Sequence, residues 1–164
     1  MRVAGFRIFS FRDGRLHSVV HDHLWERGVN QSKPCSTVSP IFSDDPVLVH
    51  PSHLCRCGFH AFYDEDHPEL IASHTVWTSI YVSVTAVIVG TDRVVLHQRG
   101  WRARKAEIVG VVATTDRLID NVIRNHYDVA MVRPEGVRSL AEKYGILGQN
   151  FDEGSPFERH WGIA

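Results

Sequence analysis

The sequence has no run of about 20 apolar residues, the length that a helix needs to cross a membrane. Its longest apolar stretch, residues 80–90, is interrupted by Ser83 and Thr85 and alternates like a strand. The N-terminus leads into a strand-like pattern without the apolar core of a signal peptide. These absences predict a soluble cytoplasmic protein that does not associate with membranes.

Cysteine is scarce, with three in 164 residues. Three is an odd number, and Cys55 and Cys57 stand too close together for an unstrained mutual disulfide. A secreted disulfide scaffold would have more cysteines, in pairs. The cysteine pattern therefore excludes that class and agrees with an intracellular location.

An excess of charge and the common catalytic motifs are also lacking. The chain has 18 basic and 19 acidic side chains, whereas nucleic-acid-binding domains normally have a continuous basic face. It contains no glycine-rich phosphate loop, dinucleotide fingerprint or helix-borne metalloprotease motif. No catalytic residue can be named, so we expect a binding function before an enzymatic one.

Alternating apolar and polar residues predict antiparallel β-structure over residues 1–113. In the first strand the alternation places Arg7 on one face together with Phe9 and Phe11. Asp13-Gly14 is a preferred pair for a tight hairpin turn and should connect this strand to the next.

A second strand pair is expected further along the chain, with Gly90-Thr91-Asp92 as its hairpin loop. On this interpretation residues 80–89 and 93–99 form the two strands. Gly100-Trp101 then bends the chain, and residues 106–112 form another strand.

The last third of the chain has helical periodicity. Thr114-Thr115-Asp116 can cap a first helix, residues 129–132 form a short strand, and Pro134 suits the first turn of a second helix. The sequence therefore predicts an α+β fold, mainly antiparallel β-structure with a C-terminal helix–strand–helix appendage. We expect one domain over residues 1–148, with a β-rich part (1–113) and a helical part (114–148), and a loosely attached tail at 149–164.

Thiol and imidazole groups cluster in a proline-rich segment with few regular elements, residues 21–57. Such a long irregular stretch needs another source of order, and a metal ion bound by thiolates would supply it. A structural zinc site takes four tetrahedral ligands, and five candidates are present: Cys35, His50, Cys55, Cys57 and His60. Three thiols with either histidine would complete the set. The alternative is that Cys55 and Cys57 straddle a strand without metal.

The same region has a recognisable motif. It consists of Trp25-x-x-Gly28-Val29-Asn30, Cys35, His50-Pro51 and Cys55-x-Cys57-Gly58-Phe59-His60-Ala61. Together with residues 97–103 and 140–145, this pattern resembles a family of small actinobacterial and mycobacteriophage proteins, over residues 5–148. The resemblance implies Cys35, His50, Cys55 and Cys57 as the ligand set, and it implies no particular activity.

A basic segment, residues 97–105, combines four cations with one indole. Such a group can bind phosphates and stack on bases, or form the centre of a protein interface. The candidate partner-binding residues are Arg99, Trp101, Arg102, Arg104 and Lys105. The alternative is a solvated bend in which Trp101 packs on the core and the arginines face water.

Taken together, these features predict a zinc-stabilised binding module that acts on a protein or a nucleic acid. The phage-like resemblance makes an accessory or regulatory role part of this hypothesis. The alternative function is a small metal- or cysteine-dependent enzyme that uses Cys55, Cys57 and nearby histidines.

Overall fold

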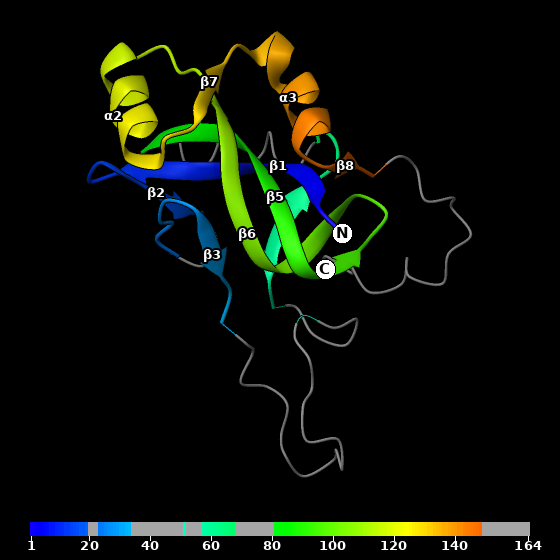
Figure 1. The fold of residues 1–164 in the computed structure, drawn as a ribbon. Helices are drawn as coiled ribbons and strands as arrows, with labels where there is room; N and C mark the ends of the chain where they lie inside the picture. The colour runs from blue at the N-terminus through cyan, green and yellow to red at the C-terminus, as the bar shows by residue number, and fades with distance from the viewer. Residues whose placement is uncertain (20–22, 34–50, 52–56, 68–80, 149–164) are drawn as a thin grey trace, which may run out of the picture.

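The computed structural model describes residues 1–19, 23–33, 51, 57–67 and 81–148. Its strands all belong to one mainly antiparallel sheet, which two short helices follow, so the α+β class is confirmed at this level. The elements are β1 (Val3–Arg12), β2 (Arg15–Ser18), β3 (Val29–Gln31), β4 (Phe59–Phe62), β5 (Val82–Leu96), β6 (Gly100–Val112), α2 (Arg117–Tyr127), β7 (Ala130–Val132), a 3-10 turn (Pro134–Gly136), α3 (Val137–Tyr144) and β8 (Ile146–Leu147) (Figure 1).

The first hairpin forms where the sequence predicts it. Asp13 and Gly14 both have positive φ, 51° and 73°, as the two central residues of a tight hairpin turn require. β1 and β2 then pair from Arg12 with Arg15 to Phe9 with Ser18.

Four strands form a closed ring. β5 pairs with β1 along nearly the whole length of β1 and with β6 on its other edge. β6 also pairs with β4, and β4 meets β1 where Phe62 lies opposite Phe6. Because each of these strands pairs on both edges, their side chains point either into the ring or away from it.

The prediction of a hairpin at Gly90-Thr91-Asp92 is wrong, because β5 continues through these residues to Leu96. Asp92 and Arg93 have φ values of 53° and 52°, and the register with β6 shifts between Thr91 and Val94. An extra residue in one strand produces a bulge that bends and twists the strand without reversing it. The chain reverses after Leu96, where the amide of His97 donates to the carbonyl of Gly100 at 2.8 Å.

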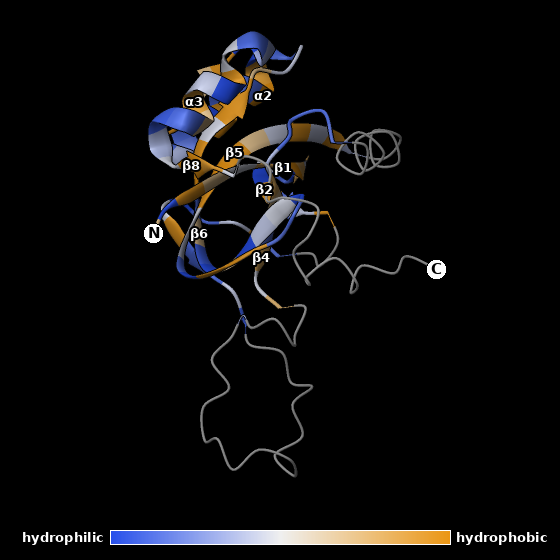
Figure 2. Cartoon of the chain, turned by 90° about the vertical axis from the view of Figure 1, so that its right-hand side faces the viewer, coloured by the Kyte–Doolittle hydropathy of each residue, from blue (hydrophilic) through white to orange (hydrophobic). Residues whose placement is uncertain are grey.

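Two buried clusters make up the core. The first lies on the inner face of the ring and continues under α2, through Ile123 and Tyr127. The second lies on the outer face of β1, β5 and β6, where Val137 and Ala141 of α3 cover Phe6 and Val87. Figure 2 shows the strands beneath the helices mainly in the colours of hydrophobic residues, with hydrophilic residues on the outer sides of the helices.

The C-terminal elements begin and end at specific residues. The Asp116 side chain accepts hydrogen bonds from the amides of Leu118 (2.8 Å) and Ile119 (3.4 Å), so the predicted cap is confirmed. α3 ends at Gly145, and Ile146 then pairs with Val3 in a short parallel bridge. Neither described helix is long and apolar enough to cross a membrane.

Candidate functional site

The predicted metal ligands divide between described and undescribed parts of the chain. Cys35, His50 and Cys55 lie outside the described residues, while Cys57 and His60 lie within them. Cys57 is partly buried just before β4, and His60 is on β4 opposite Arg102. Among the residues that the structure describes, no group of three or more histidine, cysteine or acidic side chains is placed to hold a metal ion. The zinc site therefore stays a prediction.

Trp101, the proposed aromatic contact of the basic segment, is a core residue. Its side chain is 1% exposed, and its Nε1 donates to the carbonyl of Ala4 at 2.9 Å. Gly5 and Gly90 make room for the indole, since a Cβ atom at either position would lie too close to it. Stacking of Trp101 on a partner is thus excluded, and the part of the alternative that places Trp101 on the core is correct, whereas its solvated bend is not found.

Arg102 is also removed from the surface. It is 3% exposed, and its Nε donates to Nε2 of His97 at 2.9 Å. Residues 100–105 belong to the strand β6, so the expected bend is absent and alternate residues turn inward. Of the five predicted partner-binding residues, Arg99 is exposed, and Arg104 and Lys105 are partly exposed.

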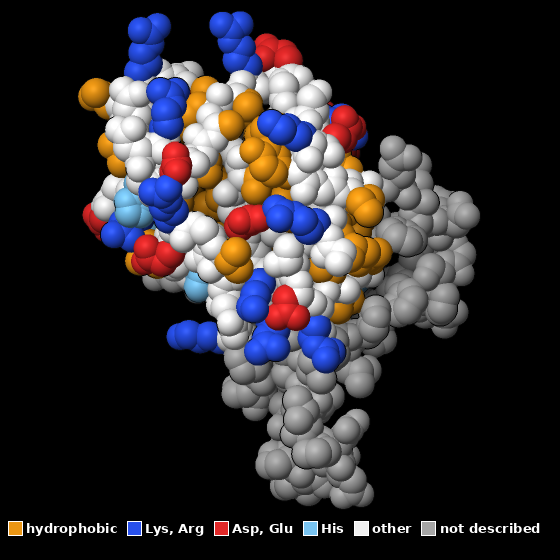
Figure 3. Space-filling model, in the orientation of Figure 1, with side chains coloured by type: hydrophobic (Ala, Val, Ile, Leu, Met, Phe, Trp, Pro, Cys, Tyr) orange, Lys and Arg blue, Asp and Glu red, His pale blue; other side chains and the backbone are white. Residues whose placement is uncertain are grey.

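Arg104 and Lys105 of the basic segment lie between the end of β3 and the bulge of β5. The amide of Ser32 donates to the carbonyl of Arg104 at 2.8 Å, so the end of β3 lies beside β6. The bulge of β5 lies on the other side, where Thr91 faces Lys105 and the Lys105 ammonium is 3.5 Å from the Asp92 carboxylate. We call Lys33, Arg93, Arg104 and Lys105 the cationic cluster. Figure 3 shows Lys and Arg side chains gathered at the lower edge of the described surface.

A different cation, Arg7, points toward the interior of the fold. Its Nη1 donates to the carbonyl of His60 at 2.7 Å, and its Nη2 donates to Oγ of Ser18 at 3.1 Å. The guanidinium carbon lies 5.8 Å from the ring centroid of Phe9 and 5.9 Å from that of Trp25. Burial lowers the pKa of Arg7 to about 10, so the group stays charged at neutral pH.

His23 packs on the same aromatic residues. Its ring centroid is 5.1 Å from that of Phe59 and 6.0 Å from that of Trp25. Burial lowers the pKa of His23, and the positive charges of Arg7 and Lys33 lower it further. Burial is the largest of these causes, and a hydrogen bond with the Asn30 side chain acts in the opposite direction.

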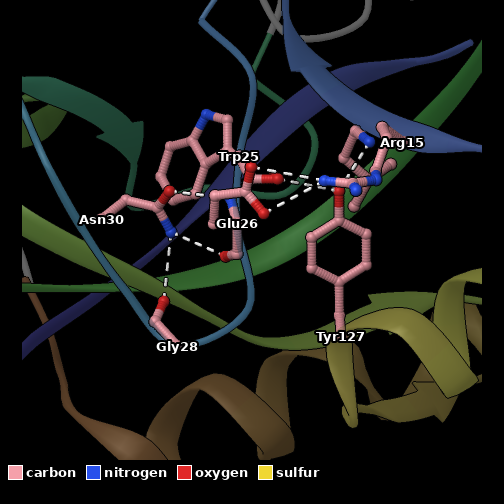
Figure 4. A network of polar contacts seen from close by, with 7 residues as sticks. Arg15, Trp25, Glu26, Gly28, Asn30 and Tyr127 are labelled. Atoms are coloured by element: carbon pink, nitrogen blue, oxygen red, sulfur yellow. Dashed lines mark hydrogen bonds and ion pairs between the residues drawn. The ribbon is translucent and has the colours of Figure 1, made fainter.

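The position of Trp25 depends on a polar network between α2 and the loops (Figure 4). The hydroxyl of Tyr127 accepts from the amide of Leu16 at 2.7 Å and donates to the carbonyl of Trp25 at 3.1 Å. Asn30 closes the following turn, accepting from the amide of Glu26 and donating to its carbonyl, both at 2.9 Å. This network holds the indole of Trp25 against Arg7.

No family model, curated protein or solved structure matches the chain. The candidate residues therefore depend on geometry alone. Arg7 was not predicted as a site residue, and His23 was not among the five predicted metal ligands. The available signal was the alternation in the first strand, which places an arginine on the face of Phe9 and Phe11.

Proposed function

We propose that the protein is a binding module that recognises an acidic segment of a partner protein with the cationic cluster. One observation carries this proposal. Among the described residues, Lys33, Arg93 and Arg104 form no ion pair, although strand pairing and the bulge of β5 place them next to one another. Unpaired cations on paired strands are pre-organised for carboxylates and lose little freedom on binding.

An acidic protein segment fits this cluster better than a nucleic acid does. Base stacking by Trp101 is excluded because its indole is buried. The net charge of the chain is −1, and a few clustered cations are less than the continuous basic face that nucleic-acid-binding domains present. Recognition by charge alone, without an aromatic platform, favours carboxylates on a protein.

Zinc is part of the same proposal. Four of the residues Cys35, His50, Cys55, Cys57 and His60 would hold the ion and order the segment between β3 and β4. A closed site of this type stabilises the fold. Its four protein ligands fill every coordination position of the zinc, so that no position is open for the water or substrate of a catalytic site. Gly58, with φ of 108°, lets the chain turn between Cys57 and β4, and a Cβ atom there would lie 3.0 Å from the carbonyl of Ala103.

Fluorescence anisotropy with two labelled probes tests the proposal. The probes are a glutamate octapeptide and an oligothymidylate of similar charge. We expect the peptide to bind, with an affinity that falls as salt is added. The double variant Arg93→Ala/Arg104→Ala should weaken binding about fivefold, because two partly exposed ion pairs together contribute about 1 kcal/mol.

The matched control removes two exposed cations from α2, as Arg117→Ala/Arg124→Ala, with the same change in net charge. Equal loss of binding in both double variants would show a nonspecific effect of charge and would refute the cluster as the site. Tighter binding of the oligothymidylate than of the peptide would refute a protein partner.

A further inference from the structure

Arg7 is a cation in an otherwise apolar part of the sheet. It lies between Phe6 and Ile8 in β1 and opposite Ala86 of β5, whose small side chain leaves room for the guanidinium group. Phe9 and Val84, the next pair on this inner face, are fully buried. The charge is thus placed where apolar side chains would pack.

The guanidinium group has more N–H donors than it has acceptors among the residues that the structure describes. Arginine carries five N–H donors, and the hydrogen bonds to the His60 carbonyl and to Ser18 account for two of them. Nε is buried and has no hydrogen-bond partner, and among the described residues no carboxylate forms an ion pair with Arg7. Because Nε is buried and unpaired in this partly buried side chain, an anion that accepts from it would stabilise the folded state.

The aromatic neighbours of Arg7 leave these donors available. Phe9 and Trp25 lie within cation–π distance of the guanidinium carbon, and such contacts use the charge of the group without accepting its in-plane N–H bonds. The in-plane N–H donors of the Arg7 guanidinium therefore still need an acceptor that lies in the plane of the group. Carboxylate and phosphate oxygens match this donor geometry with two parallel hydrogen bonds.

His23 supplies a second donor at the same aromatic residues. Its Nε2 is buried without a hydrogen-bond partner, and its ring packs on Trp25, as Arg7 does. Arg7 and His23 therefore present their donors beside the same indole. One anion bound near both would accept hydrogen bonds from each of them.

From these contacts we infer that the protein binds one small oxyanion, a carboxylate or phosphate group, through Arg7 on the inner face of β1 and through His23, which follows β2 in the chain. This site is separate from the cationic cluster, since it uses none of those side chains. Ser18 links it to Trp25, because its Oγ accepts from Arg7 and also from the indole Nε1 at 2.9 Å. Anion binding should therefore be detectable at the Trp25 indole.

The test is an NMR titration of the whole protein with sodium phosphate and, separately, sodium acetate, each at constant ionic strength set with sodium chloride. We expect a saturable shift of the Trp25 indole N–H resonance with at least one of the anions. The Trp101 indole, which donates to the Ala4 carbonyl, is an internal control and should not move. Saturation by phosphate alone assigns a phosphate-bearing ligand, and saturation by acetate assigns a carboxylate. The absence of a saturable shift with both anions would overturn the inference.

Arg7→Met removes the charge and keeps a side chain of similar length, and it should abolish the response. Arg7→Lys keeps the charge without the planar donor edge, and it should weaken binding at least about tenfold. Arg93→Met is the matched control from the cationic cluster and should respond like the wild type. A wild-type response in Arg7→Met would overturn the site, and loss of the response in Arg93→Met would do the same. Should Arg7→Met fail to fold, the wild-type titration and Arg7→Lys still decide the question.

Discussion

Replacing Trp101 by phenylalanine separates a core role from a surface role for this residue. The indole is 1% exposed and donates to the carbonyl of Ala4 at 2.9 Å. Phenylalanine cannot donate, and a buried acceptor left without a donor costs about 1–3 kcal/mol. The smaller ring also leaves part of the space between β1, β5 and β6 unfilled, and such a cavity adds to the cost. We expect the free energy of unfolding to fall by about 2–3 kcal/mol, a value that combines these two costs.

Urea denaturation followed by far-UV circular dichroism measures this change. With slopes of about 1–3 kcal/mol per molar urea for small proteins, the midpoint should fall by about 1 M while the slope stays constant. Leu118→Ala is the control, because Leu118 is 76% exposed and exposed substitutions change stability by about 0.5 kcal/mol or less. A Trp101→Phe protein as stable as the Leu118→Ala control, with peptide binding lost, would refute the core role and restore Trp101 as a partner contact.

Other substitutions test separate parts of the account. Gly90→Ala should destabilise the protein by about 1–3 kcal/mol in urea denaturation, since its Cβ would lie 2.8 Å from two ring atoms of Trp101; an unchanged midpoint would contradict the close packing. Tyr127→Phe should cost about 1–3 kcal/mol in thermal unfolding, because two buried backbone groups lose their partner; a cost below about 0.5 kcal/mol, the range of ordinary surface changes, would count against the network. Asp116→Ala should lower the free energy of unfolding by about 1 kcal/mol through loss of the helix cap, whereas Asp116→Asn should keep most of the stability that the cap provides. Metal analysis should find about one zinc per chain, and Cys57→Ser should unfold the protein; a metal-free wild-type protein that is fully folded would exclude the structural zinc site.

Elements with local signals could be predicted from the sequence. The β1–β2 hairpin depends on Asp13 and Gly14, two adjacent residues that adopt positive φ. The start of α2 depends on Asp116, and the buried face of α3 follows from the spacing of Val137 and Ala141. Each of these elements is determined by residues that are close together in the sequence.

The β5–β6 pair could not be predicted in the same way. Gly90-Thr91-Asp92 has the composition of a turn, yet β5 is held there by β1 on one edge and β6 on the other. Because β5 pairs with strands that are distant in sequence, the chain forms a bulge at these residues and does not reverse its direction. The true hairpin, at His97 to Gly100, lacks a preferred turn pair.

The candidate sites depended on distant contacts as well. Trp101 stands among cations in the sequence, and only the approach of Gly5 and Gly90 explains why it is buried. Arg7 shares a face with Phe9, but α3 covers one face of β1 while the ring encloses the other. The sequence alone could not show that the face of Arg7 is the enclosed one. Because both faces of β1 are buried, the usual rule that a charged residue marks the solvent side fails here.

The measurement that tests the central claim most directly is an amide NMR shift map of the wild-type protein titrated with the glutamate octapeptide. We expect saturable shifts at Lys33, Arg93, Arg104 and Lys105, with α2 unchanged at the same peptide concentrations. Shifts centred on α2, or the absence of saturable shifts at the cationic cluster, would contradict it.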